Sequence, residues 1–297
     1  MLEERITDFL QYLKFEKRYS PNTVVAYKND LLQFKDFIAT EFSLDDINFI
    51  THFHIRSWLV TFKNDKKTAK TINRKSSGLS SFFKHLLRQG IVEKNPVRQL
   101  HSVRLPERLP SYLKEQETEQ LLEEQQFPDG FKGFTDRMIC ELLYQTGMRR
   151  NELLQLKEID VEWSMKQVRV LGKGNKERLV PISPMLIESL KDYIAEKKEI
   201  EDSDRNHLLV LENGRPLYAG YIYRTVKFHL TNTGTTLSKK SPHVLRHTFA
   251  TQLLNNGANI QAIKDLLGHS SLAATQVYTH NNIDRLKEIH KLNHPRG

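Results

Sequence analysis

The stretch QVRVLGKGNKERLVPI, residues 167–182, decides the fold class because the periodicity of the chain changes there. Val168 and Val170 alternate with polar residues, and an apolar pattern resumes at Leu179. The residues between them, 172–176, are rich in glycine and polar side chains, which is typical of a turn. The sequence therefore predicts an antiparallel hairpin, and with it a small β-sheet.

Helical patterns lie on both sides of this hairpin. Before it, we expect helices over about 114–125 and 136–146, and a further helical segment that begins at 151–156. After it, the chain is again mostly helical. Caps and stops divide these helices: caps at Ser241-Pro242, Asn259 and Ser271, and stops at Gly147, Gly257 and Gly268.

The first hundred residues show four helical patterns. The first falls within 2–13, the second follows a cap at Ser20, and the third follows a cap at Thr51. The fourth runs over about 68–89. An all-helical domain is the simplest arrangement of these segments.

Prolines separate the two halves. Pro106 and Pro110 lie in a stretch that helices do not cross, because proline lacks a backbone donor and restricts the residue before it. We predict an all-helical domain over 1–100, a linker over 101–112 and a mixed α+β domain over 113–297. The predicted fold class is mainly α with a small antiparallel β-sheet.

Basic residues concentrate in the first third of a chain whose net charge is +9. Residues 1–105 hold 18 Lys and Arg against 11 Asp and Glu, whereas the remainder holds 27 against 25. One interpretation is a solvated basic surface. The other is a face that follows DNA phosphates, since their neutralisation releases counterions. We place the candidate DNA contacts on the polar face of the fourth helix, at Lys67, Lys70, Thr71, Arg74 and Lys75.

Composition excludes several classes of protein. A content of 38% hydrophobic and 27% charged residues is that of a globular chain. No apolar run resembles a signal-peptide core or a membrane span, so we expect a cytoplasmic protein without a membrane partner. A single cysteine, Cys140, cannot form an internal disulfide, and the sequence has no cysteine cluster for zinc.

Five short segments carry the candidate chemistry: TGMRR at 146–150, LGKGNKER at 171–178, HVLRH at 243–247, LGHS at 267–270 and VYTH at 277–280. Taken singly, each has an ordinary interpretation. Arg149 would be a surface charge, Lys173 a solvated turn residue and Tyr278 a packing residue. Their significance lies in the combination.

The segment with His243 and Arg246 indicates a phosphate-binding site more strongly than the other segments do. On a helix that begins at Ser241-Pro242 they lie on one face, near the positive end, where they would present two phosphate-binding donors. The alternative is a capping histidine beside a surface arginine. A zinc pair of His243 and His247 is not predicted, because Val244 occupies the position where that motif needs its glutamate.

In this order and spacing the segments resemble the tyrosine recombinases, and among them the Xer-like bacterial branch. The resemblance extends from SPNT at 20–23 and TINR at 71–74 to the tyrosine near the end. Four strings carry it: TGMRRNELLQL, GKGNKERLVPI, HVLRHTFATQLL and LLGHSSLAATQVYTH. Asn151 and Gln252 depart from the serine and histidine that are commoner in the branch, but neither is a catalytic position.

The resemblance implies that six side chains form the active site: Arg149 and Arg246 on the scissile phosphate, His243 assisting them, Lys173 as a mobile acid, His269 as the second histidine and Tyr278 as the nucleophile. Arg150 lies where the family varies, so Arg149 is the candidate. Two guanidiniums can fork onto oxygens that gain charge in the transition state. A phenol with a pKa near 10 needs cationic neighbours or a base, which either histidine would supply. A lysine can protonate the leaving 5′-oxygen.

The implied product is a covalent 3′-phosphotyrosine, which stores the energy of the broken bond. No metal, ATP or other cofactor is then expected, and the sequence has no P-loop or carboxylate-rich cluster. The resemblance also implies two domains that clamp double-stranded DNA with paired inverted half-sites. Four protomers, identical or including a paralogous recombinase, would exchange strands through a Holliday junction.

The apolar positions within 281–297 predict a terminal helix, which in the family docks into a neighbouring protomer. The alternative is a helix packed on its own domain. A DNA translocase is a further implied partner. The chain length favours Xer-like chromosome dimer resolution over the alternative of an integrase or excisionase of a mobile element. Less favoured are a type IB topoisomerase-like enzyme, which would act as a monomer, and a catalytically silent DNA-binding regulator.

Overall fold

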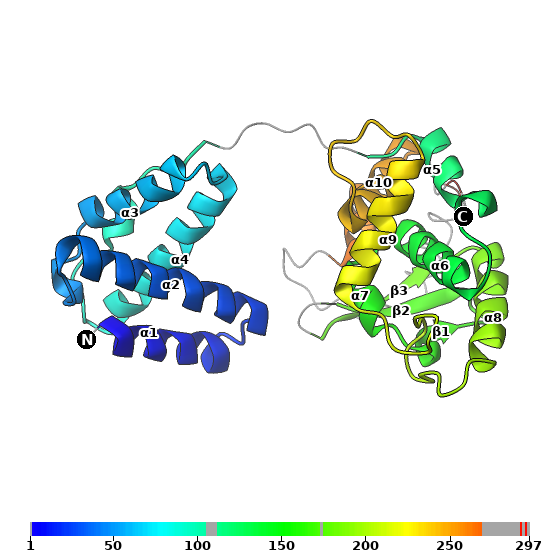
Figure 1. Cartoon of the computed structure of the whole chain (residues 1–297), viewed down its shortest axis with the longest axis horizontal. Coiled ribbons are helices and arrows are strands. Elements are labelled where there is room, and N and C mark those ends of the chain that lie inside the picture. Colours follow the sequence, from blue (N-terminus) through cyan, green and yellow to red (C-terminus); the bar gives the residue numbers. More distant parts are fainter. Residues whose placement is uncertain (1, 105–111, 173–174, 269–291, 293–294, 296–297) are drawn as a thin grey trace. The chain divides into compact units, whose positions relative to one another are not determined.

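The computed structural model describes residues 2–104, 112–172, 175–268, 292 and 295. The chain divides into two compact units, Met1–Arg108 and Leu109–Gly297 (Figure 1). Each unit has its own hydrophobic core. The expected fold class, mainly helical with a small antiparallel sheet, is confirmed.

The first unit consists of four helices. They are α1 (Leu2–Gln11), which continues into a π-helical turn at Tyr12–Glu16, α2 (Pro21–Phe42), α3 (His52–Asn64) and α4 (Ala69–Arg88), with short 3-10 turns at Ile47–Phe49 and Pro96–Gln99. The predicted cap at Ser20 is present, and Thr68, which was not predicted as a cap, acts in the same way at the start of α4. Ser20 and Thr68 each accept a hydrogen bond from the backbone three residues ahead, at Thr23 and Thr71.

Aromatic side chains at helical spacing fill the core of this unit. Phe9, Phe34 and Phe82 are almost fully buried, and the Trp58 ring packs edge-on against Phe34 at 5.2 Å between centroids. Phe9 and Phe82 form a similar contact at 5.5 Å. These rings come from α1, α2, α3 and α4, so each of the four helices contributes a large side chain to the shared core.

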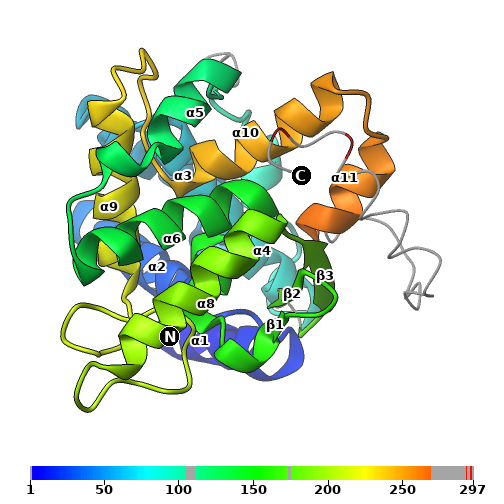
Figure 2. The ribbon, with the colours of Figure 1, turned by 90° about the vertical axis from the view of Figure 1, so that its right-hand side faces the viewer.

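The second unit surrounds one buried helix. Its elements are α5 (Glu115–Leu122), a 3-10 turn at Glu124–Gln126, α6 (Phe131–Thr146), α7 (Arg150–Gln155), a 3-10 turn at Glu158–Asp160, β1 (Val161–Glu162), β2 (Gln167–Leu171), β3 (Glu177–Pro181), α8 (Pro184–Lys198), α9 (Ala219–Asn232), α10 (Pro242–Asn255) and α11 (Ile260–Leu267). Helix α6 contacts α5, α7, α8, α9 and α10, and it lies in the middle of the unit in Figure 2.

Helix α6 is buried on nearly all sides, as expected of a helix that is the centre of a core. It begins at Phe131, five residues before the predicted Asp136, because its first turn also packs inward. Phe131 stacks on Tyr193 at 5.0 Å and Phe134 meets the same ring edge-on at 5.4 Å. These aromatic contacts extend the helix beyond the stretch that aliphatic periodicity marked.

The sheet is a three-stranded antiparallel meander in the order β1-β2-β3. Val168 pairs with Val180, and Val170 pairs with Arg178. All four of these side chains are buried, so one face of the hairpin points inward. Strand β1 is only two residues long and was not predicted. The predicted hairpin is present, with strands that pair as the alternation indicated.

The helices after the sheet end largely where glycine was expected to end them. Gly257 and Gly268 both have positive φ at helix termini, and the Asn259 side chain caps α11 by accepting from Gln261 N at 2.7 Å. Ser241 stands at the cap position of α10, but its side chain makes no capping hydrogen bond, which corrects that expectation. Ser271 lies outside the described residues.

Candidate active site

A sharp reversal after α6 places the first candidate arginine. Gly147 ends the helix with φ +58°, a conformation that favours glycine. The Thr146 hydroxyl donates to Leu142 O at 2.5 Å and accepts from Met148 N at 3.2 Å, which ties the turn to the helix end. Arg149 then follows as the cap residue of α7.

Arg149 is held by Glu152, three residues ahead on α7. The backbone N–H of Arg149 donates to Glu152 Oε2 at 2.8 Å, and its Nη1 donates to Oε1 at 2.7 Å. The Arg149 side chain remains 36% exposed, whereas that of Glu152 is only 6% exposed. A buried carboxylate therefore anchors a guanidinium that still reaches the surface.

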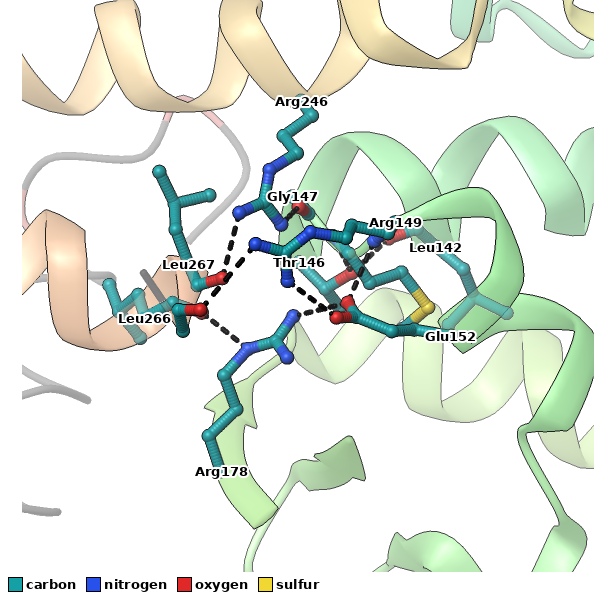
Figure 3. A network of polar contacts seen from close by, with 11 residues as sticks. Leu142, Thr146, Gly147, Arg149, Glu152, Arg178, Arg246, Leu266 and Leu267 are labelled. Atoms are coloured by element: carbon teal, nitrogen blue, oxygen red, sulfur yellow. Dashed lines mark hydrogen bonds and ion pairs between the residues drawn. The ribbon is translucent and has the colours of Figure 1, made fainter. Parts of the chain in front are cut away.

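Arg246 approaches the same place from α10. Its Nη1 donates to Gly147 O at 2.6 Å and its Nη2 to Leu267 O at 2.7 Å. Leu267 is the last residue of α11, and Arg149 Nη2 lies 3.5 Å from the carbonyl of the next residue, Gly268. Figure 3 shows both guanidiniums at this helix end, which carries the negative pole of the helix dipole.

A third arginine completes the group. Arg178 on β3 is 4% exposed, and it donates from Nη2 to Glu152 Oε2 at 2.8 Å and from Nε to Leu266 O at 2.7 Å (Figure 3). Glu152 thus joins Arg149 to Arg178. We call the four side chains Arg149, Glu152, Arg178 and Arg246 the arginine cluster; it holds three positive charges and one negative charge.

The charges of the cluster alter its titration. Burial lowers the pKa of Arg246 to about 10, and the neighbouring charges of Arg149 and Arg178 act in the same direction. Burial alone would raise the pKa of Glu152, but the hydrogen bond and charge of Arg178, together with those of Arg149, hold it below its ordinary value. Arg246 and Glu152 are therefore both charged at neutral pH, and the net positive charge of the cluster suits an anion.

The structure brings Arg149 and Arg246 together, and a third predicted residue lies on the same helix as Arg246. His243 lies on the first turn of α10, is exposed, and precedes Arg246 by three residues. Arg150 turns elsewhere, toward Ala219 O at 3.5 Å. Lys173, His269 and Tyr278 lie outside the described residues, as does the predicted terminal helix.

Comparison with known proteins assigns the family. The family model for the phage integrase family matches residues 111–285, and the model for the phage integrase N-terminal SAM-like domain matches residues 6–90. The chain belongs to the tyrosine recombinases of this family. Tyrosine recombinase XerC of Halalkalibacterium halodurans is 36% identical over 306 residues, covering 99% of this chain and 98% of the relative.

Two further relatives extend the comparison. Tyrosine recombinase XerD of Staphylococcus haemolyticus is also 36% identical, over 302 residues that cover 100% of both chains. Among solved structures, XerH recombinase in its post-cleavage complex with a palindromic difH substrate has a TM-score of 0.71 and 25% identity, covering 89% of this chain and 78% of that one. The recombinase thus resembles XerC and XerD to an equal degree.

Two members of the arginine cluster of this recombinase, Glu152 and Arg178, were not predicted. The burial of Arg178 could have been found from the alternation of side chains along β3, because Arg178 lies two residues before Val180 and therefore points inward with it. A charged residue at such a position needs a buried partner. The signal for Glu152 was its place three residues after Arg149, where a carboxylate caps a helix start.

One predicted DNA contact of the recombinase is wrongly placed. Lys75 does not lie on the exposed face of α4: its side chain is 7% exposed, and Nζ donates to Asp30 Oδ1 at 2.7 Å and Gln33 Oε1 at 2.6 Å. The reason is helical spacing, since Lys75 is three residues from Ile72 and four from Leu79, both buried. Its ammonium also lies over the Phe62 ring.

The other predicted contacts on and before α4 reach the surface. Lys67 and Lys70 are exposed, and Thr71 is half-buried with its hydroxyl 3.0 Å from that of Thr68. The Arg74 side chain is 46% exposed although its guanidinium binds Asp30 through both terminal nitrogens. Asp30 thus neutralises part of the charge that the sequence assigned to this face.

Within residues 2–104, 112–172 and 175–268, no helix has the length and apolarity needed to cross a membrane. The same ranges contain no group of three or more His, Cys, Asp or Glu side chains arranged to hold a metal ion.

Proposed function

We propose that the chain is a site-specific recombinase that cuts and rejoins double-stranded DNA through a covalent 3′-phosphotyrosine at Tyr278 and a Holliday junction. We propose further that it acts in Xer-like chromosome dimer resolution. The observation that carries the proposal is the convergence of Arg149 and Arg246, from two separate helices, on the C-terminal end of α11. The segment with Tyr278 follows that end in sequence.

The two guanidiniums suit a phosphodiester in both geometry and charge. Each terminal nitrogen of Arg246 carries two hydrogens, and each gives one of them to a backbone carbonyl. The remaining donors are available for the non-bridging oxygens, where negative charge grows as the tyrosine oxygen attacks. With a pKa near 10, Arg246 stays charged at neutral pH despite its burial.

The remaining roles come from the resemblance. His243, one helical turn before Arg246, would assist at the phosphate, and His269 would act as the second histidine. Lys173 would protonate the leaving 5′-oxygen, and Tyr278 would attack. The energy of the phosphodiester is kept in the phosphotyrosine, so the reaction needs no nucleotide cofactor.

DNA is the proposed partner of both units. Exposed Lys67, Lys70 and Arg74 would contact the backbone of a half-site, because backbone contacts position a protein without reading sequence. XerH, a site-specific recombinase, was solved bound to a palindromic difH substrate, which supports a site with inverted halves here. Two inverted half-sites imply paired protomers and a tetramer on two sites. Equal identity to XerC and XerD leaves both a homotetramer and a heterotetramer with a paralogue as proposals, and a DNA translocase as a further proposed partner.

A suicide substrate tests the chemistry. Duplexes that bind the protein would be selected from a random pool, nicked near the cleavage point and incubated in EDTA with the wild type, Tyr278→Phe and Arg246→Ala. We expect a denaturation-resistant adduct with the wild type only, and half-site binding by all three proteins. An adduct that persists with Tyr278→Phe identifies another nucleophile, and no adduct on tightly bound duplexes contradicts the proposed catalysis. Cleavage without joining of two sites would indicate topoisomerase-like activity.

A further inference from the structure

Arg178 lies on β3 and joins it to two other segments that are far away in the chain. Through Nη2 it binds Glu152 on α7, and through Nε it binds Leu266 O near the end of α11. Its own strand, β3, forms one arm of the hairpin. Because a guanidinium is planar and its donors point in fixed directions, these two bonds set the position of α7 relative to α11.

Two glycines border the Arg178 side chain, and at one of them, Gly268, a side chain would be in tight contact with it. A Cβ at Gly268 would lie 3.2 Å from Arg178 Cδ and 3.3 Å from Nη1. A Cβ at Gly172 would lie 3.7 Å from Nη1 and 3.7 Å from Glu152 Oε1. Gly172 begins the hairpin turn, where its N–H donates to Lys176 O at 2.8 Å. Arg178 therefore fills the space between the base of that turn and the end of α11.

Burial shows that Arg178 cannot act by touching DNA. Its side chain is 4% exposed, compared with 36% for Arg149. A buried charge costs free energy unless it is paired and hydrogen-bonded, and here one carboxylate and one carbonyl provide the compensation.

We propose that Arg178 is a positioning residue that joins α7, the base of the hairpin and the end of α11, and thereby fixes the geometry in which Arg149 and Arg246 meet the phosphate. The proposal rests on the proposed function. It extends that function to a residue that contacts the arginines through Glu152 and the α11 carbonyls. The next residues in sequence, Lys173 after Gly172 and His269 after Gly268, belong to the proposed catalytic set.

The test compares Arg178→Met with a matched control, Lys197→Met. Lys197 is fully buried in the same unit and has the same kinds of partner, the carboxylate of Glu158 and the carbonyl of His207. Both variants remove one buried cation and leave one carboxylate and one carbonyl without it. None of these Lys197 contacts is to the arginine cluster, so the control reproduces the structural cost alone.

The first readout is amide hydrogen exchange of the full-length protein, which needs no activity. In Arg178→Met we expect exchange to accelerate at least roughly tenfold in α7, at the end of β2 and in α11 together. In Lys197→Met these three segments should exchange as in the wild type. Acceleration confined to β3, or equal acceleration in the control, would overturn the proposal.

The second readout is the single-turnover rate of adduct formation on the suicide substrate. We expect Arg178→Met to lose a factor on the order of 100, the cost of misplacing reacting groups by about 1 Å, while half-site affinity changes less than about twofold. Lys197→Met should keep the wild-type rate at temperatures where it is folded. Equal rates in Arg178→Met and the wild type would disprove the positioning role and leave the proposed function intact.

A conservative variant separates the effect of the positive charge of Arg178 from the effect of its two directed hydrogen bonds. Arg178→Lys keeps the positive charge and is the variant to compare if Arg178→Met does not fold. A lysine presents one nitrogen and cannot reproduce the two directed bonds to Glu152 and Leu266, so we expect the rate to remain reduced by roughly tenfold or more. Full recovery by Arg178→Lys would show that charge alone suffices and would overturn the proposal. If the wild type forms no adduct, the proposed function fails, and the exchange experiment still decides the positioning role.

Discussion

Replacing Gly147 by alanine should destabilise the second unit and also slow cleavage, because the change displaces the contacts of Arg246. The backbone of Gly147 has φ +58°, which costs a residue with a Cβ about 1–2 kcal/mol. The added Cβ would also lie 2.5 Å from Phe249 Cδ1 and 2.9 Å from Leu267 Cδ2, closer than carbon atoms can approach. Overpacking of this kind typically costs about 1–3 kcal/mol. The expected loss is therefore about 2–5 kcal/mol, a large fraction of the stability of a typical domain.

The same displacement reaches the site. Phe249 lies three residues after Arg246 on α10, and the carbonyls of Gly147 and Leu267 are the two acceptors of Arg246. A shift of Phe249 displaces the helix that carries Arg246, and a shift of Leu267 displaces one of the two acceptors of its guanidinium. We therefore expect adduct formation to fall on the order of 100-fold at temperatures where the variant is still folded.

The control is Gly234→Ala. Gly234 also has a positive φ, +67°, and lies just after a helix end in the same unit, but a Cβ added there would meet no atom within 4 Å. It should lose only the backbone cost of about 1–2 kcal/mol and should keep the cleavage rate. The difference between the two variants isolates the steric contact with Phe249 and Leu267.

Urea unfolding provides the assay. The chain has two tryptophans, Trp58 in the first unit and Trp163 in the second, so a Trp58→Phe background leaves Trp163 as a reporter of the second unit. Midpoints at constant slope give the change in stability. Equal shifts for Gly147→Ala and Gly234→Ala would refute the steric argument. A destabilised Gly147→Ala with the full cleavage rate would refute the link to Arg246.

Three further outcomes are expected. Lys70→Ala should weaken half-site binding and lower the slope of log affinity against log salt concentration by about one, because Lys70 is exposed. Lys75→Met should instead destabilise the first unit and leave this slope unchanged, because Lys75 is buried. Equal slopes for the two variants would contradict the prediction. The pKa of Glu152 in the folded protein lies below its ordinary 4.5, so its ionised form stabilises the fold above pH 4.5. The difference in unfolding free energy between the wild type and Glu152→Gln should be largest at neutral pH and should decrease as the pH falls through the folded-state pKa. A difference that stays constant with pH in urea unfolding would contradict this prediction. Burial raises the pKa of the Cys140 thiol well above its ordinary value, so a thiol reagent should label it only as fast as the protein opens, and rapid labelling of the native protein would show that it is accessible.

Local patterns were sufficient to predict most of the fold. The cap at Ser20, the glycine stop at Gly147 and the alternation at Val168 and Val170 each act through neighbouring residues in the chain, and the structure contains the corresponding elements. Strand β1 escaped prediction because two residues carry no periodicity. The early start of α6 escaped because its reason, the Tyr193 ring on α8, lies 62 residues after Phe131 in sequence.

The candidate site was predictable only in part. Motifs indicated Arg149, Arg246 and His243 as candidates, but they could not indicate that Glu152 binds both Arg149 and Arg178, because that depends on β3 lying beside α7. The error at Lys75 has the opposite cause. Its spacing from Ile72 and Leu79 indicated an inward position, but the charge suggested the surface, and only the partner Asp30 on α2 resolves the conflict.

The acceptors of the three arginines explain why sequence indicates this site so weakly. Arg246 binds only Gly147 and Leu267 carbonyls among its hydrogen bonds to described residues, and Arg178 uses Leu266 O. Carbonyls at a helix C-terminus carry partial negative charge whatever the side chain, so their residue types are set by packing instead. These carbonyls offset part of the repulsion among three guanidiniums without neutralising them, as a second carboxylate would. The positive charge that a phosphate needs is thereby kept. Among the backbone carbonyls that accept from the arginines, those of Gly147 and Gly268 belong to residues with a left-handed backbone, and these two glycines are visible in the sequence.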